Sequence, residues 1–303
     1  MSQVFSSISN GAPLAAPAQK LSSQSPKPEL EALFNSPYVH DLKLQICEMG
    51  RRMWQREYVD GNGGNLAIRV GLDIALCTPT LVSKGWLKPE DMCLVDFEGR
   101  QLLGTRKRTS EILMHLQMMK HQPQVFATCH CHPPYATAFA VANVAPPTRL
   151  LPEFEIFCSV GVAPYRTPGS PEMGRLVAEL TSQYNTILMS NHGVVTWSHN
   201  SIEEAYWRTE IVEAYCRTVA AARQLGQPLN TFTGPQMKEL LQIKQSLGFV
   251  DPRYGLTESE LAAPAWLKPL PATETRTVPL PRVTARPRET ARIPGAELAA
   301  GAP

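Results

Sequence analysis

The sequence has little net charge, no long apolar run and no signal for export. Its 29 Lys and Arg residues nearly balance 27 Asp and Glu residues, so the formal net charge is only +2. This balance argues against a broad nucleic-acid footprint but not against a local anion site. No segment reaches the roughly 20 apolar residues of a membrane span. The N-terminus also lacks a basic region followed by an apolar run. We therefore expect no nucleic-acid partner and no membrane partner.

The seven cysteines are not spaced like the disulfide framework of a small secreted protein, and their number is odd. We therefore expect a reducing environment and a cytoplasmic location. Five of them are expected to be buried thiols: Cys47, Cys77, Cys93, Cys158 and Cys216.

The two ends of the chain differ in composition from its middle. Residues 1–30 are rich in Ser, Ala, Gln and Pro, which indicates a flexible N-terminal arm. Residues 261–303 are rich in Pro and are predicted to form an unstructured C-terminal tail. The compact body therefore covers residues 31–260, a length that suits one α/β domain.

Within this body, helical patterns alternate with short strand-like segments. Several such segments between residues 66 and 103 follow one another through tight turns, which favours an antiparallel or mixed sheet over repeated βαβ units. Apolar residues at helical spacing predict helices over residues 37–58, 110–120, 135–143, 173–184, 201–225 and 234–247. Residues 153–158 alternate between polar and apolar. The expected fold is a single α/β domain with a central, largely antiparallel or mixed sheet flanked by helices.

A Cys-His-Cys-His run ends the strand predicted over residues 125–132. Successive side chains of a strand point to opposite faces, so His130 and His132 share one face while Cys129 and Cys131 share the other. Two imidazoles two residues apart can bind one divalent metal ion. The structural alternative is a hydrogen-bonded histidine pair in a core or an interface, and the pair alone does not decide between the two.

His192 is the best candidate for a third ligand. It lies in the sequence Asn191-His192-Gly193, between an apolar run over residues 186–189 and a strand-like segment over residues 194–197. This context predicts a tight turn that glycine permits, from which the imidazole could reach the first pair. Three neutral imidazoles with one position left open describe a catalytic site better than a closed structural one. The other histidines lack this context: His40, His115, His121 and His199.

Two further motifs could contribute to a site. The glycine-rich segment over residues 60–65 precedes a strand and could bind an anion through its backbone N–H groups, although hairpins need such turns for structural reasons alone. Thr109-Ser110-Glu111 begins the helix predicted over residues 110–120. Its hydroxyls are expected to cap the helix, while the free N–H groups there suit a phosphate ester.

Six motifs follow one another along the chain: Gly64-Asn65, Thr78-Pro79-Thr80, Ser110-Glu111, His130-x-His132, Ala163-Pro164-Tyr165 and Asn191-His192-Gly193. In this order they resemble the motifs of the class II aldolase/adducin family. The resemblance covers most of residues 37–250, and the ordered set is more specific for the family than for one reaction. The family includes fuculose-phosphate and rhamnulose-phosphate aldolases and ribulose-phosphate 4-epimerase.

The resemblance implies a role for each matched residue. It implies that His130, His132 and His192 bind a divalent metal, usually zinc, with manganese or another divalent ion in some relatives. Glu111 would be the catalytic acid/base. The residues implied to bind the substrate phosphate are Gly64, Asn65, Thr78, Thr109 and Ser110. The family also implies a cyclic homotetramer with active sites at subunit boundaries.

The implied activity is that of a metal-dependent carbon-carbon lyase. The metal would stabilise an enediolate while a phosphorylated keto sugar is cleaved to dihydroxyacetone phosphate and a small aldehyde. Glu111 would exchange a proton with that enediolate, which requires partial burial to bring the carboxyl pKa toward the working pH. The alternatives are decarboxylation or 4-epimerisation of a sugar phosphate by the same family, and a non-enzymatic scaffold like adducin.

The chain departs from the fuculose-phosphate aldolase pattern at the proton donor. Tyrosines used there align near Leu150 or Leu151 and near Leu247, which carry no hydroxyl, and Tyr254 is a candidate replacement for the second. Some family members also work inside bacterial microcompartments, directed there by a short terminal helix. Neither tail here shows a convincing amphipathic helix, so we rank a shell partner below simple disorder.

Overall fold

The computed structural model describes residues 20–263. These residues belong to the first of the two units into which the chain divides, residues 1–268 and 269–303. The predicted arm up to residue 19 and the predicted tail from residue 264 lie outside the described residues. Inside them, Leu30 and Leu261 are buried, in helices that begin at Lys27 and end at Ala262. The boundaries of the body at residues 31 and 260 stay a prediction of the sequence.

The described residues form one eight-stranded sheet with the order β4-β3-β2-β1-β5-β8-β7-β6. Neighbouring strands are antiparallel except for β6 and β7, so the prediction of a largely antiparallel or mixed sheet is confirmed. The strands are β1 (Asn65–Arg69), β2 (Ile74–Cys77), β3 (Cys93–Asp96), β4 (Gln101–Leu103), β5 (Ala127–Cys131), β6 (Val160–Ala163), β7 (Thr186–Met189) and β8 (Gly193–Ser198).

Nine α-helices lie within the described residues. They are α1 (Lys27–Phe34), α2 (Pro37–Gln55), α3 (Ile112–His121), α4 (Pro134–Val141), α5 (Pro152–Phe157), α6 (Pro171–Leu180), α7 (Ile202–Gln224), α8 (Gly234–Ser246) and α9 (Glu258–Ala262). Two 3-10 turns, η2 (Lys84–Trp86) and η3 (Pro89–Asp91), precede β3. All six predicted helices are present within a few residues of the expected bounds. None of the described helices combines the length and the apolar composition that a membrane span requires.

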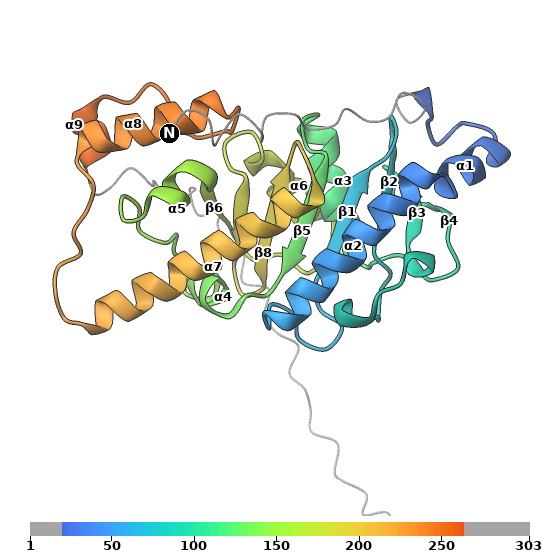
Figure 1. The fold of residues 1–303 in the computed structure, drawn as a ribbon, viewed down its shortest axis with the longest axis horizontal. Helices are drawn as coiled ribbons and strands as arrows, with labels where there is room; N and C mark the ends of the chain where they lie inside the picture. The colour runs from blue at the N-terminus through green and yellow to red at the C-terminus, as the bar shows by residue number, and fades with distance from the viewer. Residues whose placement is uncertain (1–19, 264–303) are drawn as a thin grey trace, which may run out of the picture. The chain divides into compact units, whose positions relative to one another are not determined.

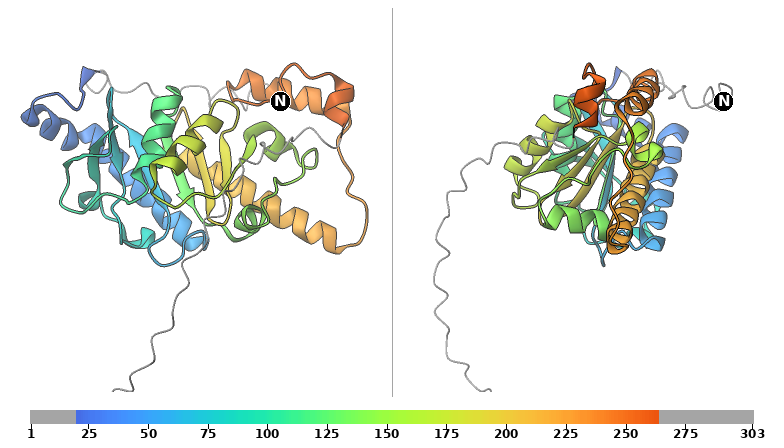
Figure 2. Two further views of the ribbon diagram at one scale, coloured as in Figure 1. Left: turned by 180° about the vertical axis from the view of Figure 1, so that it is seen from behind. Right: turned by 90° about the vertical axis from the view of Figure 1, so that its left-hand side faces the viewer.

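Helices cover both faces of the sheet. In Figure 1, α2 and α7 cross the face toward the viewer, and Figure 2 shows α3 and α6 on the opposite face. Alternation along β1 supplies both layers, because Leu66 and Ile68 pack with α2 while Ala67 packs with α3 and α6. A third cluster joins α4, α5 and α7 to the β6–β8 end of the sheet. The central strands of the sheet are thus covered on both faces, and this packing fixes where their ends lie.

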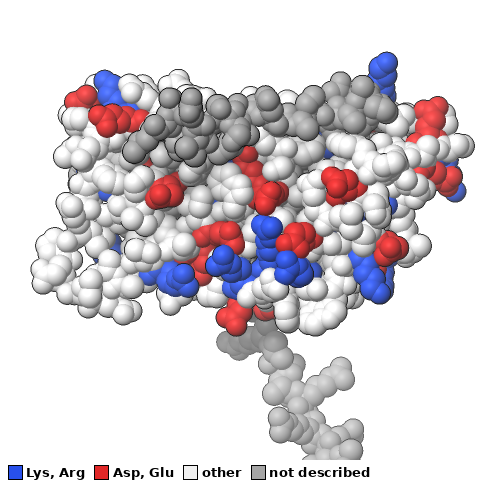
Figure 3. All heavy atoms as spheres, in the orientation of Figure 1, with Lys and Arg blue, Asp and Glu red and all other residues white. Residues whose placement is uncertain are grey.

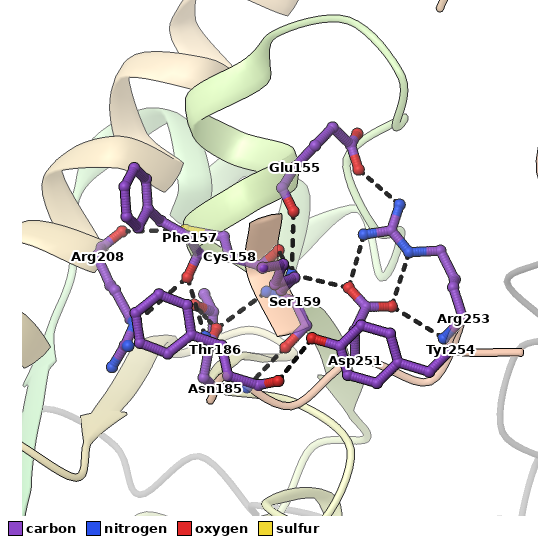
Figure 4. A network of polar contacts seen from close by, with 12 residues as sticks. Glu155, Phe157, Cys158, Ser159, Asn185, Thr186, Arg208, Asp251, Arg253 and Tyr254 are labelled. Carbon is purple, nitrogen blue, oxygen red and sulfur yellow. Dashed lines mark hydrogen bonds and ion pairs between the residues drawn. The ribbon is translucent and has the colours of Figure 1, made fainter. Parts of the chain in front are cut away.

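Residues 153–158, whose alternation is typical of a strand, form helix α5 instead. Pro152 begins this helix, and the Glu155 side chain is completely buried beneath it. Arg253 pairs with both Glu155 and Asp251, at 2.5 and 2.7 Å (Figure 4). A buried carboxylate needs such a partner, so α5 forms as part of a charge network with the C-terminal segment.

The face of α2 and α7 carries charges of both signs, as Figure 3 shows. Ion pairs link the two helices there, between Arg52 and Glu203 at 3.2 Å and between Arg56 and Glu210 at 3.1 Å. Oppositely charged side chains on this face therefore pair with each other.

The seven cysteines are all free thiols, and six are buried while Cys47 is only half-buried.

Candidate metal centre

His130, His132 and His192 converge on one point at the edge of the central strands. Each can offer one ring nitrogen such that the three nitrogens lie within 4.8 Å of one another. His130 lies one residue before the end of β5, His132 directly follows this strand, and His192 lies in the turn between β7 and β8. Cys129 turns to the other face, where its Sγ lies 3.8 Å from the sulfur of Met53. The convergence predicted from the sequence is therefore present in the structure.

Hydrogen bonds set the orientation of the first two rings. Nδ1–H of His130 donates to the carbonyl of Val194 at 2.8 Å, and Nδ1–H of His132 donates to Asp60 Oδ1 at 2.8 Å. In the neutral form of each ring, Nε2 then carries a lone pair. Both Nε2 atoms are buried and have no hydrogen-bond partner among the described residues. Buried acceptors without a donor are costly, and a bound cation would satisfy both, so the site fits a metal ion.

The turn that carries His192 depends on its neighbour Asn191. Asn191 adopts a left-handed conformation with φ of 55°, which asparagine tolerates better than most residues. The backbone N–H of His192 donates to the Met189 carbonyl at 3.0 Å and closes the turn. A tight turn was predicted here, but Asn191 and not Gly193 supplies the left-handed residue.

Glu111 faces two of the three histidines. One carboxylate oxygen lies 3.3 Å from Nε2 of His130 and the other lies 3.3 Å from Nε2 of His192. Burial alone would raise the pKa of Glu111, but His130 and His192 outweigh it, and the pKa lies below its ordinary value. This is opposite to the upward shift expected from partial burial. The carboxylate is therefore held ionised beside the imidazoles, where it can accept a proton.

Burial lowers the pKa of His132, and burial together with His130 lowers the pKa of His192 to about 4. His130 differs, because Glu111 outweighs burial and raises its pKa. Two of the three rings are thus neutral at neutral pH without any metal, which is the form that binds cations.

Asn65 joins Glu111 to a histidine that the sequence did not single out. Asn65 Nδ2 donates to Glu111 Oε2 at 2.7 Å, while its Oδ1 lies 2.5 Å from Nε2 of His115. The other ring nitrogen of His115 lies 2.7 Å from Thr128 Oγ1. His115 follows Glu111 by one helical turn, and that i, i+4 spacing was the available signal.

The five residues expected to bind phosphate lie around the start of α3 and β1. Gly64 has a left-handed φ of 75°. Thr78 Oγ1 accepts from the Leu66 N–H at 3.2 Å, and Thr109 Oγ1 accepts from the Glu111 N–H at 3.3 Å. Ser110 is exposed. The predicted hydroxyl cap is wrong, because Glu111 occupies the N-cap position of α3 and no side chain caps the helix.

Lys84 is a buried cation beside the glycine-rich turn. Its side chain is almost fully covered, and Nζ donates to the carbonyls of Asn62 and Val82 at 2.9 and 2.6 Å. Burial lowers the pKa of Lys84 to about 8, partly offset by the charge of Glu111. The sequence offered no signal for this role, because the lysine lies in η2, within the long connection between β2 and β3.

The structure also places the three leucines that align near the tyrosine proton donors of fuculose-phosphate aldolase. Leu150 is half-buried against the α4–α7 cluster, and Leu151 is exposed. Leu247 directly follows α8. The hydroxyl of Tyr254 donates to the Phe249 carbonyl at 2.6 Å, so within this chain that group is already used.

Known proteins share both the sequence and the fold. An L-fuculose phosphate aldolase of Methanococcus vannielii is 35% identical over 176 residues, which are 57% of this chain and 92% of that protein. A 3-oxo-tetronate 4-phosphate decarboxylase of Haemophilus influenzae is 31% identical over 203 residues, 65% and 95% of the two chains. The crystal structure of YgbL from Klebsiella pneumoniae, described as a candidate aldolase/epimerase/decarboxylase, superposes with a TM-score of 0.60 at 28% identity. That match covers 66% of this chain and 97% of YgbL.

The profile of the family described as Class II Aldolase and Adducin N-terminal domain matches residues 44–220. This range contains the three converging histidines, Glu111 and every strand of the sheet. Enzymes of this family use a divalent metal, and the three histidine nitrogens lie close enough together to hold one. The chain thus belongs to the class II aldolase/adducin family and is a lyase of the class II aldolase type.

Proposed function

We propose that the protein is a divalent-metal-dependent aldehyde-lyase that cleaves a phosphorylated keto sugar by a retro-aldol reaction. The products would be dihydroxyacetone phosphate and a small aldehyde such as lactaldehyde. The observation that carries the proposal is the position of Glu111, whose carboxylate lies 3.3 Å from two histidines of the metal centre. An ionised carboxylate beside a metal centre suits proton transfer at a carbon next to a carbonyl.

The proposed metal ligands are His130, His132 and His192. When bound, the ion would supply Lewis-acid stabilisation for the negative charge that develops on the substrate oxygens. Zinc is the first choice because neutral imidazoles suit it and three protein ligands leave a position for substrate. Manganese or another divalent ion is the alternative.

The two oxygens of Glu111 have different surroundings. Oε2 accepts the amide of Asn65, whereas Oε1 is buried and has no hydrogen-bond partner among the residues that the structure describes. Oε1 is therefore the oxygen that we assign to accept and return the proton. The tyrosine donors of fuculose-phosphate aldolase have no counterpart at Leu150, Leu151 or Leu247, so the group that protonates the leaving alkoxide differs in this chain.

The proposed phosphate site comprises Gly64, Asn65, Thr78, Thr109 and Ser110. The N-terminus of α3 supports it, because no side chain caps this helix and its free N–H groups favour an anion. The buried cation of Lys84 adds positive potential to the same region. Asn65 is the weakest member, because both ends of its amide already bond Glu111 and His115.

The relatives support a second reaction. The Haemophilus influenzae protein is named as a 3-oxo-tetronate 4-phosphate decarboxylase, and decarboxylation passes through the same type of carbanion as aldol cleavage. Epimerisation is a third outcome of that chemistry. A scaffold role like that of adducin is disfavoured by the three converging histidines and Glu111.

The decisive experiment combines metal analysis with product analysis. Purified protein is assayed with fuculose-phosphate and rhamnulose-phosphate, and the Glu111→Gln and His192→Ala variants serve as comparisons. We expect about one metal per chain and aldol cleavage in the wild type, with both lost in His192→Ala. Glu111→Gln should keep the metal and lose turnover, and full activity in that variant would refute the assignment.

Carbon dioxide release without aldehyde would replace the aldolase by a decarboxylase, and an intact carbon skeleton would indicate an epimerase. If carefully prepared protein contains no metal, a non-enzymatic scaffold role like that of adducin would again be the better hypothesis.

We also propose a homotetramer with active sites at subunit boundaries. A groove of about 660 Å³ between α5 and α7 supports it, because its lining includes exposed Leu151 and several aromatic side chains, namely Tyr58, Phe157, Trp207 and Tyr215. Light scattering of the purified protein tests the assembly directly. The cytoplasmic location stays a prediction of the sequence, and the microcompartment shell stays the weaker alternative that we ranked below simple disorder.

A further inference from the structure

We infer that His115 is a positioning residue that orients the Glu111 carboxylate through the side chain of Asn65. The inference rests on the proposed function, because it assigns His115 a task only if Glu111 transfers the proton. His115 touches neither the histidine cluster nor, on this assignment, the substrate. It would act through one intervening amide.

Three short contacts form a continuous chain in the protein interior. Nδ1 of His115 lies 2.7 Å from Thr128 Oγ1, and Nε2 lies 2.5 Å from Asn65 Oδ1. Asn65 Nδ2 then lies 2.7 Å from Glu111 Oε2. His115 is completely buried and Asn65 almost so. The chain joins α3 to β1 and β5, the two strands that bring Asn65 opposite His130.

The chemistry of each atom fixes the direction of these bonds. Asn65 donates to a carboxylate through Nδ2, so its Oδ1 faces His115 and can only accept. Nε2 of His115 must therefore carry the hydrogen. Burial lowers the pKa of His115 to about 3, so the ring is neutral and Nδ1 accepts from the Thr128 hydroxyl. One arrangement of hydrogens satisfies every group in the chain.

This arrangement prevents the Asn65 amide from turning over. A rotated amide would place Nδ2 against the Nε2–H of His115 and Oδ1 against Oε2 of Glu111, so that two donors and two acceptors would face each other. Donation to Oε2 also distinguishes the two carboxylate oxygens, because it leaves Oε1 without a hydrogen bond among the described residues, 3.3 Å from Nε2 of His192. The geometry thus points to His115 as the residue that fixes the Asn65 amide and so makes the two oxygens of Glu111 different.

The competing explanation is that the chain only stabilises the fold, as many buried histidines do. The two explanations differ in what they predict for folded, metal-loaded protein. A structural role changes the amount of folded protein, while a positioning role changes turnover by each folded subunit. The test therefore needs one measurement on the wild type and one on variants.

The first measurement is the ¹⁵N NMR spectrum of the imidazoles in the metal-loaded wild-type protein. We expect His115 to be a neutral ring with hydrogen on Nε2, and slow solvent exchange of the Asn65 side-chain N–H₂. A ring with hydrogen on Nδ1, or a charged ring at neutral pH, would overturn the inference. This result does not depend on any variant or on activity.

The second measurement compares His115→Leu with His121→Leu, which changes an exposed histidine on the same helix. We expect kcat per metal-loaded subunit of His115→Leu to fall about 10- to 100-fold, in the range reported for residues that orient a functional group. KM and metal content should change less than about twofold, and His121→Leu should match wild type.

His115→Gln should recover part of kcat, because its amide N–H₂ can donate to Asn65. Wild-type kcat in folded His115→Leu would overturn the inference even if its melting temperature falls. If His115→Leu does not fold, His115→Gln and the wild-type NMR result decide the question. Full activity of Glu111→Gln would instead defeat the proposed function, and the NMR result would still report on the chain of hydrogen bonds.

Discussion

Gly193 lies so close to His132 that no side chain fits between them. A Cβ on Gly193 would lie 2.6 Å from Cδ2 of His132 and 2.6 Å from the Cys131 carbonyl. Real Cβ contacts are not this short, so one of the groups would have to move. Gly193 begins β8, and its neighbour Val194 holds the His130 ring through its carbonyl. The glycine therefore allows β8 to approach the histidine pair.

Gly193→Ala should weaken metal binding by displacing His132, with only a moderate loss of stability. Zinc content after dialysis and a competitive chelator titration would measure the effect, for which we expect at least a tenfold loss of affinity. Gly226→Ala is the control for lost stability alone, because its left-handed φ of 69° strains an alanine while the added methyl group meets no atom within 4 Å. Unchanged zinc affinity in Gly193→Ala would contradict a role for this glycine in placing His132.

Asp60 should support metal binding from outside the ligand set. Asp60→Ala removes the acceptor for the Nδ1–H of His132, so we expect metal affinity to fall about 10- to 100-fold. Asp60→Asn keeps an acceptor oxygen and should lose less. Because Asp60 is largely exposed, the change should leave thermal stability nearly unchanged. Equal affinities of the two variants would contradict an orienting role.

Lys84→Met should impair substrate binding more than metal binding. The change leaves the carbonyls of Asn62 and Val82 without their donor and removes a buried positive charge near the proposed phosphate site. We expect KM for the phosphorylated substrate to rise about tenfold or more, while zinc content stays near one per chain. Exposed Lys88 supplies the matched control, Lys88→Met. A KM that does not change would remove Lys84 from the phosphate region.

Lys244→Met and Lys238→Met should differ strongly in stability although both change α8. Lys244 is fully buried and pairs with Asp251 at 2.7 Å, whereas Lys238 pairs with Glu258 at the surface at 3.7 Å. Breaking a buried pair costs about 3 kcal/mol or more, and an exposed pair contributes about 1 kcal/mol or less. Urea unfolding measures both. Similar losses would mean that the network around Arg253 tolerates the missing charge.

His115 should contribute to the loss of folding stability as the pH falls below neutral. Its pKa is about 3 in the folded chain, below the ordinary value of 6.5, so the unfolded chain binds its proton first as the pH falls. The free energy of unfolding should therefore decrease as the pH is lowered from about 6.5 to 3. His115→Gln should show a shallower decrease over this window in urea titrations, and an identical slope would contradict the buried neutral ring.

The sequence predicted the parts of the site that depend on local geometry. Side-chain alternation along one strand was sufficient to place His130 and His132 on the same face, and turn chemistry placed His192 between two strands. Both predictions use only neighbours in the chain. Glu111 received its role from the family resemblance and not from spacing.

The remaining parts depend on partners far apart in the chain. Asp60 meets His132 across 72 residues, and His115 meets Asn65 across 50. Neither contact could be inferred before the pairing of β1 with β5 was known. Helix α5 was missed for the same reason, because the carboxylate of Glu155 is buried only where Arg253 reaches it across 98 residues.

The pairing of β5 has one more consequence. His130 lies opposite Asn65 on β1 and opposite Val195 on β8. A slip of β5 by one residue against both neighbours would turn Cys129 and Cys131 toward α3. A metal ion at the proposed site would then meet thiolate sulfurs, which bind zinc tightly in closed structural sites. The register of one five-residue strand thus selects nitrogen over sulfur, and with it an open coordination position over a sealed one.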